Sequence, residues 1–401
     1  MSEEQKENIQ AGNPLGEASV ASLMVKFAVP SIIAMIVSAL YNIVDQLFIG
    51  QAVGTLGNAA TNVAFPLTTS CIALALMFGI GGASCFNLNM GRGSSERAVY
   101  FVGNAIVCLI GSGVILFGIA EIFLTPLLKG FGAPGDVLPY AQTYVRITAI
   151  GFPFMILTAG GCHLIRADGS PAFAMKAMVM GAIINIILDP IFIFLLKWGI
   201  AGAAWATAIG QVVSFAMCAV YFFKPKSFKL KKSSFIPNIT ILSKMINLGA
   251  ATFITQISIV ALTLVSNMTL ARYGALSKYG PDIPISVFSI QTKVYTIVLS
   301  IVTGIVLGGQ PIFGYNYGAK RMDRVREAYK IVLRATLITG ITATIIFQLW
   351  PKVVVGIFGS GNGLYQEFAV KTFRIYLSLM TVTCLVKMTA VFFQSIGKSK
   401  H

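Results

Sequence analysis

Ten long apolar stretches divide this 401-residue chain, and they constrain its fold more than any other feature. Each is long enough to cross a bilayer as a helix, which takes about 20 residues. Backbone exposed to lipid must satisfy its own hydrogen bonds, and the stretches lack the two-residue alternation of a barrel strand. The sequence therefore predicts an all-α integral membrane protein. Its spans lie near residues 22–50, 57–88, 98–128, 138–162, 172–197, 200–223, 241–272, 283–312, 325–350 and 365–394.

The basic residues gather in the connections on one side of these spans. If the N-terminus is cytoplasmic, clusters such as 224–232 and 320–326 fall inside, whereas five basic residues fall outside: Lys129, Lys197, Arg272, Lys278 and Lys352. Short loops rich in Lys and Arg stay on the cytoplasmic side. We therefore expect a multi-pass protein of the cell inner membrane with a cytoplasmic N-terminus. The formal net charge of +16 follows from this topology and does not indicate a nucleic-acid partner.

The chain also repeats itself. GGASCFNLNMGRGSSERA (81–98) aligns without a gap on GGQPIFGYNYGAKRMDRV (308–325), an offset of 227 residues. The first copy runs through six spans, so the second copy begins on the same side of the membrane. The sequence thus predicts two six-helix repeats related by a pseudo-two-fold axis along the membrane normal. The second copy reaches about four helices at His401, and we expect two further spans in a complete repeat.

These features divide the chain into four parts. Residues 1–20 are expected to form a cytoplasmic N-terminal tail, and residues 21–223 an N-terminal lobe with spans 1–6. Residues 224–240 form a basic cytoplasmic linker, and residues 241–401 a C-terminal lobe with spans 7–10.

Two acids inside the spans are the most informative polar residues, since a carboxylate there costs at least about 2.5 kcal/mol to insert. Asp45 and Asp189 both lie toward the outer ends of spans 1 and 5. Each acid has an amide on its own helical face, Asn42 for Asp45 and Asn185 for Asp189. Further candidates at the same depth complete the predicted site: Asn42, Asn185, Tyr144 and Thr207. Such a group can bind a proton or Na⁺, or it can merely join the helices by hydrogen bonds.

The second half has no equivalent acid. It offers Gln256, Gln291 and Lys293 as weaker candidates. Lys293 can repel or replace a cation, or it can extend harmlessly toward the membrane surface. The sequence therefore favours ion binding in the first lobe.

Several segments together resemble a known family. They are FAVPSIIAMIVSALYNIVDQLFIG (27–50), NMGRGSSERA (89–98) with its echo NYGAKRMDRV (316–325), RADGSP (166–171), NIILDPIFIF (185–194) and GAAWAT (202–207). In order and spacing they are similar to multidrug and toxic compound extrusion (MATE) transporters. The resemblance implies two six-helix lobes around a central cavity, and export of organic, often cationic, drugs in exchange for H⁺ or Na⁺. It also implies an ion site at Asp45, Tyr144, Asn185, Asp189 and Thr207.

From the residues and the resemblance we expect a monomeric secondary antiporter in the lipid bilayer. It would use no cofactor beyond the coupling ion, with Na⁺, if used, held at Asp45, Asp189, Asn185 and Thr207. The nearest alternative is a flippase for lipid-linked oligosaccharides, which would need several basic residues facing the cavity. An enzyme is not expected, because the two histidines have no partnered nucleophile or metal ligands.

Overall fold

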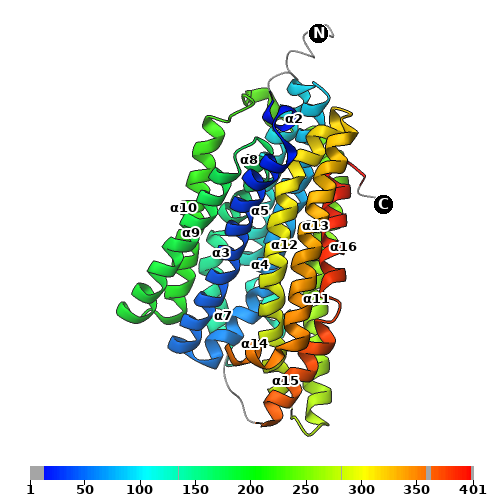
Figure 1. Ribbon diagram of the computed structural model, residues 1–401. Coiled ribbons are helices and arrows are strands. Elements are labelled where there is room, and N and C mark those ends of the chain that lie inside the picture. The colour runs from blue at the N-terminus through cyan, green and yellow to red at the C-terminus, as the bar shows by residue number, and fades with distance from the viewer. Residues whose placement is uncertain (1–12, 134, 281, 358–362, 399–401) are drawn as a thin grey trace.

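A computed structural model describes residues 13–133, 135–280, 282–357 and 363–398. Within these ranges the chain is helical and contains no strand (Figure 1). Eight of the described helices are long and apolar enough to cross a membrane, and two bent helix pairs supply two further candidate spans. The prediction of an all-α membrane protein is therefore confirmed, and all ten predicted spans have a counterpart.

The first repeat contains six spans and several short elements. Its helices are α2 (Pro14–Glu17), α3 (Val20–Val53), α4 (Thr55–Gly91), α5 (Ser95–Ile122), α6 (Leu124–Gly130), α7 (Leu138–Ile150), α8 (Phe152–Ala167), α9 (Pro171–Pro190) and α10 (Gly199–Phe223). Proline at the first or second helical position begins α7, α8 and α9, where its missing N–H has no helical partner to lose.

The second repeat copies the helix boundaries of the first. It contains α11 (Ile239–Ala275), α12 (Asp282–Gly318), α13 (Met322–Leu349), α14 (Pro351–Ile357), α15 (Gly363–Tyr376) and α16 (Met380–Ser395). Both ends of α4, α5 and α6 recur 227 residues later in α12, α13 and α14, and both ends of α8 recur 228 residues later in α16. The internal repeat seen in the sequence is thus a repeat of helices.

Three spans depart from a straight helix. The axis bends by 55° between α7 and α8 and by 43° between α15 and α16. The fifth span is irregular at Pro190, because α9 ends there and continues as a π-helix, Ile191–Leu195. A proline removes one backbone donor, and a π-turn is one way for a helix to absorb that loss.

The two repeats meet along α3, α4, α11 and α12, where small residues allow close packing (Figure 1). A Cβ on Gly81 of α4 would collide with the backbone carbonyl of Met245 on α11. At the equivalent place Gly308 of α12 lies against the backbone of Ala28 on α3. These contacts follow the same pseudo-symmetry as the helix boundaries.

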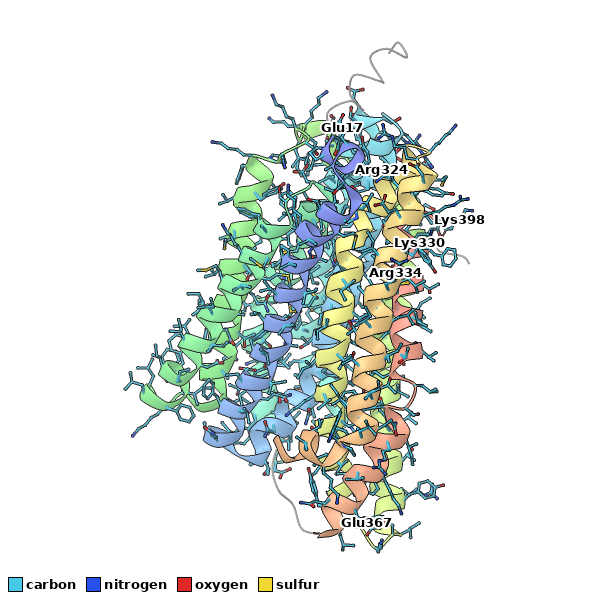
Figure 2. All side chains as sticks on the ribbon, in the orientation of Figure 1. Glu17, Arg324, Lys330, Arg334, Glu367 and Lys398 are labelled. Carbon is cyan, nitrogen blue, oxygen red and sulfur yellow. The ribbon has the colours of Figure 1, made fainter. Side chains whose placement is uncertain are left out.

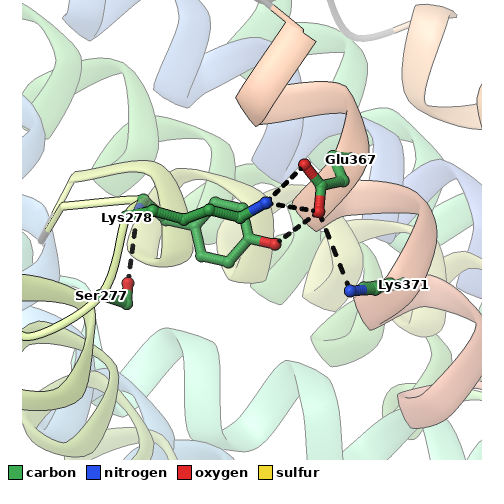
Figure 3. Close-up of polar contacts among 5 residues, drawn as sticks. Ser277, Lys278, Glu367 and Lys371 are labelled. Carbon is green, nitrogen blue, oxygen red and sulfur yellow. Dashed lines mark hydrogen bonds and ion pairs between the residues drawn. The ribbon is translucent and has the colours of Figure 1, made fainter.

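Polar contacts fix each end of the molecule. At the end that holds Glu17, Arg324 of α13 donates hydrogen bonds to the carbonyls of Leu15 and Ala18, at 3.3 and 2.6 Å (Figure 2). At the opposite end Lys278, which follows α11, donates to both carboxylate oxygens of Glu367 on α15, at 2.8 and 2.9 Å (Figure 3). The second contact ties α11 to α15 within the second repeat.

Candidate functional site

Asp45 and Asp189 meet inside the first repeat. Asp45 lies on α3 and Asp189 at the end of α9, two helices that pack along each other. The side chain of Asp45 is 8% exposed and that of Asp189 is fully buried. Their carboxyl groups lie close enough to interact directly, and one oxygen of Asp45, Oδ1, has no hydrogen-bond partner among the described residues. Two carboxylates in contact repel each other unless a proton or a cation lies between them.

An amide and a hydroxyl extend this pair toward α10. Asn185 lies one turn before Asp189, and its Nδ2 donates to Asp189 Oδ1 at 3.4 Å and to Thr207 Oγ1 at 3.3 Å. With the amide turned over, Nδ2 reaches the other Asp189 oxygen at 3.3 Å and Oδ1 accepts from the Thr207 backbone N–H at 3.3 Å. Either orientation connects α9 to α10 through Asn185.

Two tyrosines complete the polar cluster. Tyr144 of α7 lies close to Thr207 and near both acids. Tyr41 of α3 also lies near Asp45 and Asp189, although it was not among the sequence candidates. A signal for it was present, since Tyr41 precedes Asp45 by four residues and therefore shares its helical face.

Asn42 is the first-lobe candidate for which the structure shows no contact with the acid pair. Its side chain is exposed, and Nδ2 donates to the carbonyl of Ser38 one turn earlier, at 2.7 Å. The structure shows no bond between Asn42 and Asp45, because the carbonyl of Ser38 within the same helix satisfies the amide. A part for Asn42 in the site stays a prediction.

The second-half candidates do not join the acid pair. Gln291 is fully buried and donates to the Thr372 carbonyl at 3.2 Å, while its Oε1 has no hydrogen-bond partner in the described chain. Gln256 and Lys293 are partly buried and make no hydrogen bond or ion pair with the residues that the structure describes. The described polar contacts at Asp45 and Asp189 thus come from the first repeat.

The cluster can bind a small cation without a conventional metal site. Nowhere in the described ranges do three His, Cys, Asp or Glu side chains gather to hold a metal ion. Two carboxyls, one amide and hydroxyl groups nevertheless provide oxygen ligands of the kind that hard cations prefer. An apolar group, Ile49, Ile193 and Ala203, packs beside Tyr144 and limits the access of water. This arrangement suits the exchange of a proton or Na⁺.

Two helical repeats with a buried acid pair in the first are typical of a membrane transporter. The MatE family model matches residues 30–191 and 251–401, which together make up most of the chain. This chain belongs to the MatE family.

Relatives of known name agree with this assignment. The chain is 26% identical over 386 residues to "Multidrug export protein MepA" of Staphylococcus haemolyticus, covering 95% of this chain and 80% of that protein. It is 26% identical over 388 residues to the MepA of Staphylococcus aureus strain MRSA252, with the same coverage. Among solved structures, an outward-facing multidrug resistance MATE transporter of the MOP superfamily has a TM-score of 0.86 at 23% identity. That match covers all of this chain and 86% of the other, and it supports the fold.

Proposed function

We propose that this chain exports small organic compounds, chiefly cations, across its membrane in exchange for H⁺ or Na⁺. The observation that carries the proposal is the contact between the carboxyl groups of Asp45 and Asp189 inside an apolar bundle. A group that must gain a cation to relieve repulsion can couple the arrival of an ion to a change of helix packing. The export activity in the names of the MepA relatives supports the choice of substrate class.

The proposed mechanism depends on the three helices that carry the polar cluster, α3, α9 and α10. Ion binding at Asp45 and Asp189 draws α3 and α9 together, and Asn185 transmits that change to α10 through Thr207. The lobes then rock about their shared interface, so that the substrate leaves on the outer side while the ion enters. The basic connections near Arg92, Lys226 and Arg321 are placed on the cytoplasmic side in this scheme.

Export can be tested in a drug-susceptible bacterial host that lacks its own efflux pumps. Expression of the chain is expected to lower the retention of a fluorescent organic cation such as ethidium. Asp189→Asn keeps the shape of the side chain but removes its charge, and it should abolish the effect at equal membrane abundance. Asp136→Asn makes the same change on an exposed residue and should retain full export. Equal retention in hosts with and without the chain would contradict the proposal.

A further inference from the structure

The linker between the two lobes is held in one conformation by two buried polar side chains. Asp168, which follows α8, accepts hydrogen bonds from the Tyr221 hydroxyl at 2.6 Å and from the backbone N–H groups of Lys226 and Ser227 at 2.7 and 2.9 Å. Its side chain is only 3% exposed. These contacts fix the beginning of the linker against the first lobe.

The end of the linker is fixed in the same way by Asn104 of α5, which is fully buried. Its Nδ2 donates to the carbonyls of Ser234 and Ile236 at 3.0 and 3.2 Å, and its Oδ1 accepts from the N–H of Asn238 at 2.9 Å. Asn238 in turn caps the first turn of α11. The linker therefore has defined geometry at both ends.

Between these two attachments an aromatic side chain enters the core. Phe228 is 7% exposed and packs edge-on against Phe86 of α4, with ring centroids 5.3 Å apart. Because Phe228 points inward, the charged residues on either side of it, Lys226 and Lys229, are left exposed on the surface.

A cavity of about 440 Å³ lies between this linker and the start of α5. Three exposed lysines line it, Lys226, Lys229 and Lys231, and so do the first two residues of α5, Ser95 and Glu96. No side chain of the described chain caps the first turn of α5. Uncapped N–H groups at a helix start attract anions. Glu96 is the single acid in the lining, and it lies 3.5 Å from Lys231.

We propose that this cavity binds the phosphate group of an anionic phospholipid. Three lysines and the start of a helix line it, and phosphate is the common biological anion that such donors recognise. The remaining lining is partly apolar, with Val99, Tyr100 and Phe228, which suits the glycerol and upper acyl region of a lipid better than a free ion. The linker also lies at the end of the bundle where α5 and α11 begin, the level at which headgroups are expected.

The test uses the full chain in detergent and short-chain lipids. Dihexanoyl phosphatidylglycerol is expected to bind at least about tenfold more tightly than dihexanoyl phosphatidylcholine, as followed by native mass spectrometry. Each lysine should contribute about fivefold, so that Lys229→Gln weakens binding measurably and the triple change K226Q/K229Q/K231Q removes most of the preference. The triple change K129Q/K197Q/K352Q removes the same charge from exposed positions elsewhere and should leave binding unchanged.

A variant that is expected to strengthen lipid binding tests the same cavity. Glu96→Gln removes the one competing carboxylate and frees Lys231, so it should tighten phosphatidylglycerol binding by about fivefold. Inorganic phosphate should compete only weakly, because it lacks the apolar part of the lipid. The proposal is overturned if phosphatidylglycerol binds the linker variants as well as wild type, if Glu96→Gln weakens binding, or if inorganic phosphate competes as well as the lipid.

Discussion

Gly91 at the end of α4 and Gly318 at the end of α12 occupy equivalent positions in the two repeats, and each contacts the backbone of the opposite helix. A Cβ on Gly91 would collide with the carbonyl of Tyr315, and a Cβ on Gly318 would collide with the carbonyl of Leu88. The two lobes are therefore closed against each other at this end of the molecule. In the proposed mechanism, rocking of the lobes separates this pair of glycines and brings it together again.

Substitution at this contact should destabilise the closed arrangement. Gly91→Ala forces α4 and α12 apart, and we expect a loss of about 1–3 kcal/mol in the free energy of unfolding. Gly111→Ala is the matched control, because a Cβ at this position in the middle of α5 meets nothing within 4 Å. It should leave stability unchanged or raise it slightly. Thermal melting of the purified variants in detergent measures both, and equal melting temperatures for the two variants would contradict the close contact.

Asn185 and Asn42 allow a direct comparison of an asparagine bonded to the acid pair with one that is not. Asn185→Leu removes the donor that reaches Asp189 and the bond to Thr207, so we expect ion-driven export to fall by at least about tenfold. Asn42→Leu changes an exposed amide that donates to the Ser38 carbonyl and has no bond to either acid, and export should persist. Efflux from proteoliposomes distinguishes them. Equal losses in the two variants would mean that Asn42 also belongs to the site.

The Asp168 attachment should matter for stability. Asp168→Asn replaces one acceptor oxygen by an NH₂ group that faces N–H and O–H donors, and the expected cost is about 1–3 kcal/mol in the free energy of unfolding. The linker should then be cleaved faster by trypsin after Lys226 and Lys229. Asp136→Asn, on an exposed loop, is the control and should alter neither property. A linker that stays equally resistant in both variants would argue against the attachment.

Arg324 should hold the segment before α3 against the second lobe. Arg324→Gln loses the hydrogen bonds to the Leu15 and Ala18 carbonyls, so amide hydrogen exchange in residues 13–24 should accelerate. Arg326→Gln changes an exposed residue on the same helix and should not affect exchange there. If residues 13–24 exchange their amide hydrogens at the same rate in both variants, Arg324 does not hold this segment.

Much of the fold was predictable, because span length and hydropathy report directly on helices in lipid. The 227-residue offset likewise predicted the paired helix boundaries. The bends at the α7–α8 and α15–α16 junctions were not predicted, since residues such as Gly151 carry no strong local signal for a bend in an apolar helix.

The candidate site was also predictable only in part. Asp45 and Asp189 could be selected because acids are rare in spans, and Asn185 because it lies one turn from Asp189. Tyr41 was missed since tyrosines are common at membrane interfaces and its helical spacing alone is a weak signal. The linker attachments could not be predicted, because the linker partners of Asp168 and Asn104 lie 58 to 134 residues away in the chain.

Coupling through the acid pair is the central claim, and ion flux in reconstituted vesicles tests it most directly. Proteoliposomes loaded with a fluorescent organic cation should take up H⁺ or ²²Na⁺ in proportion to the cation released through the wild-type protein. Asp45→Asn preserves the shape and hydrogen bonding of the side chain but removes its charge. We predict that this variant melts like the wild type and shows no coupled ion uptake. Undiminished ion uptake and efflux through the Asp45→Asn protein would contradict the account.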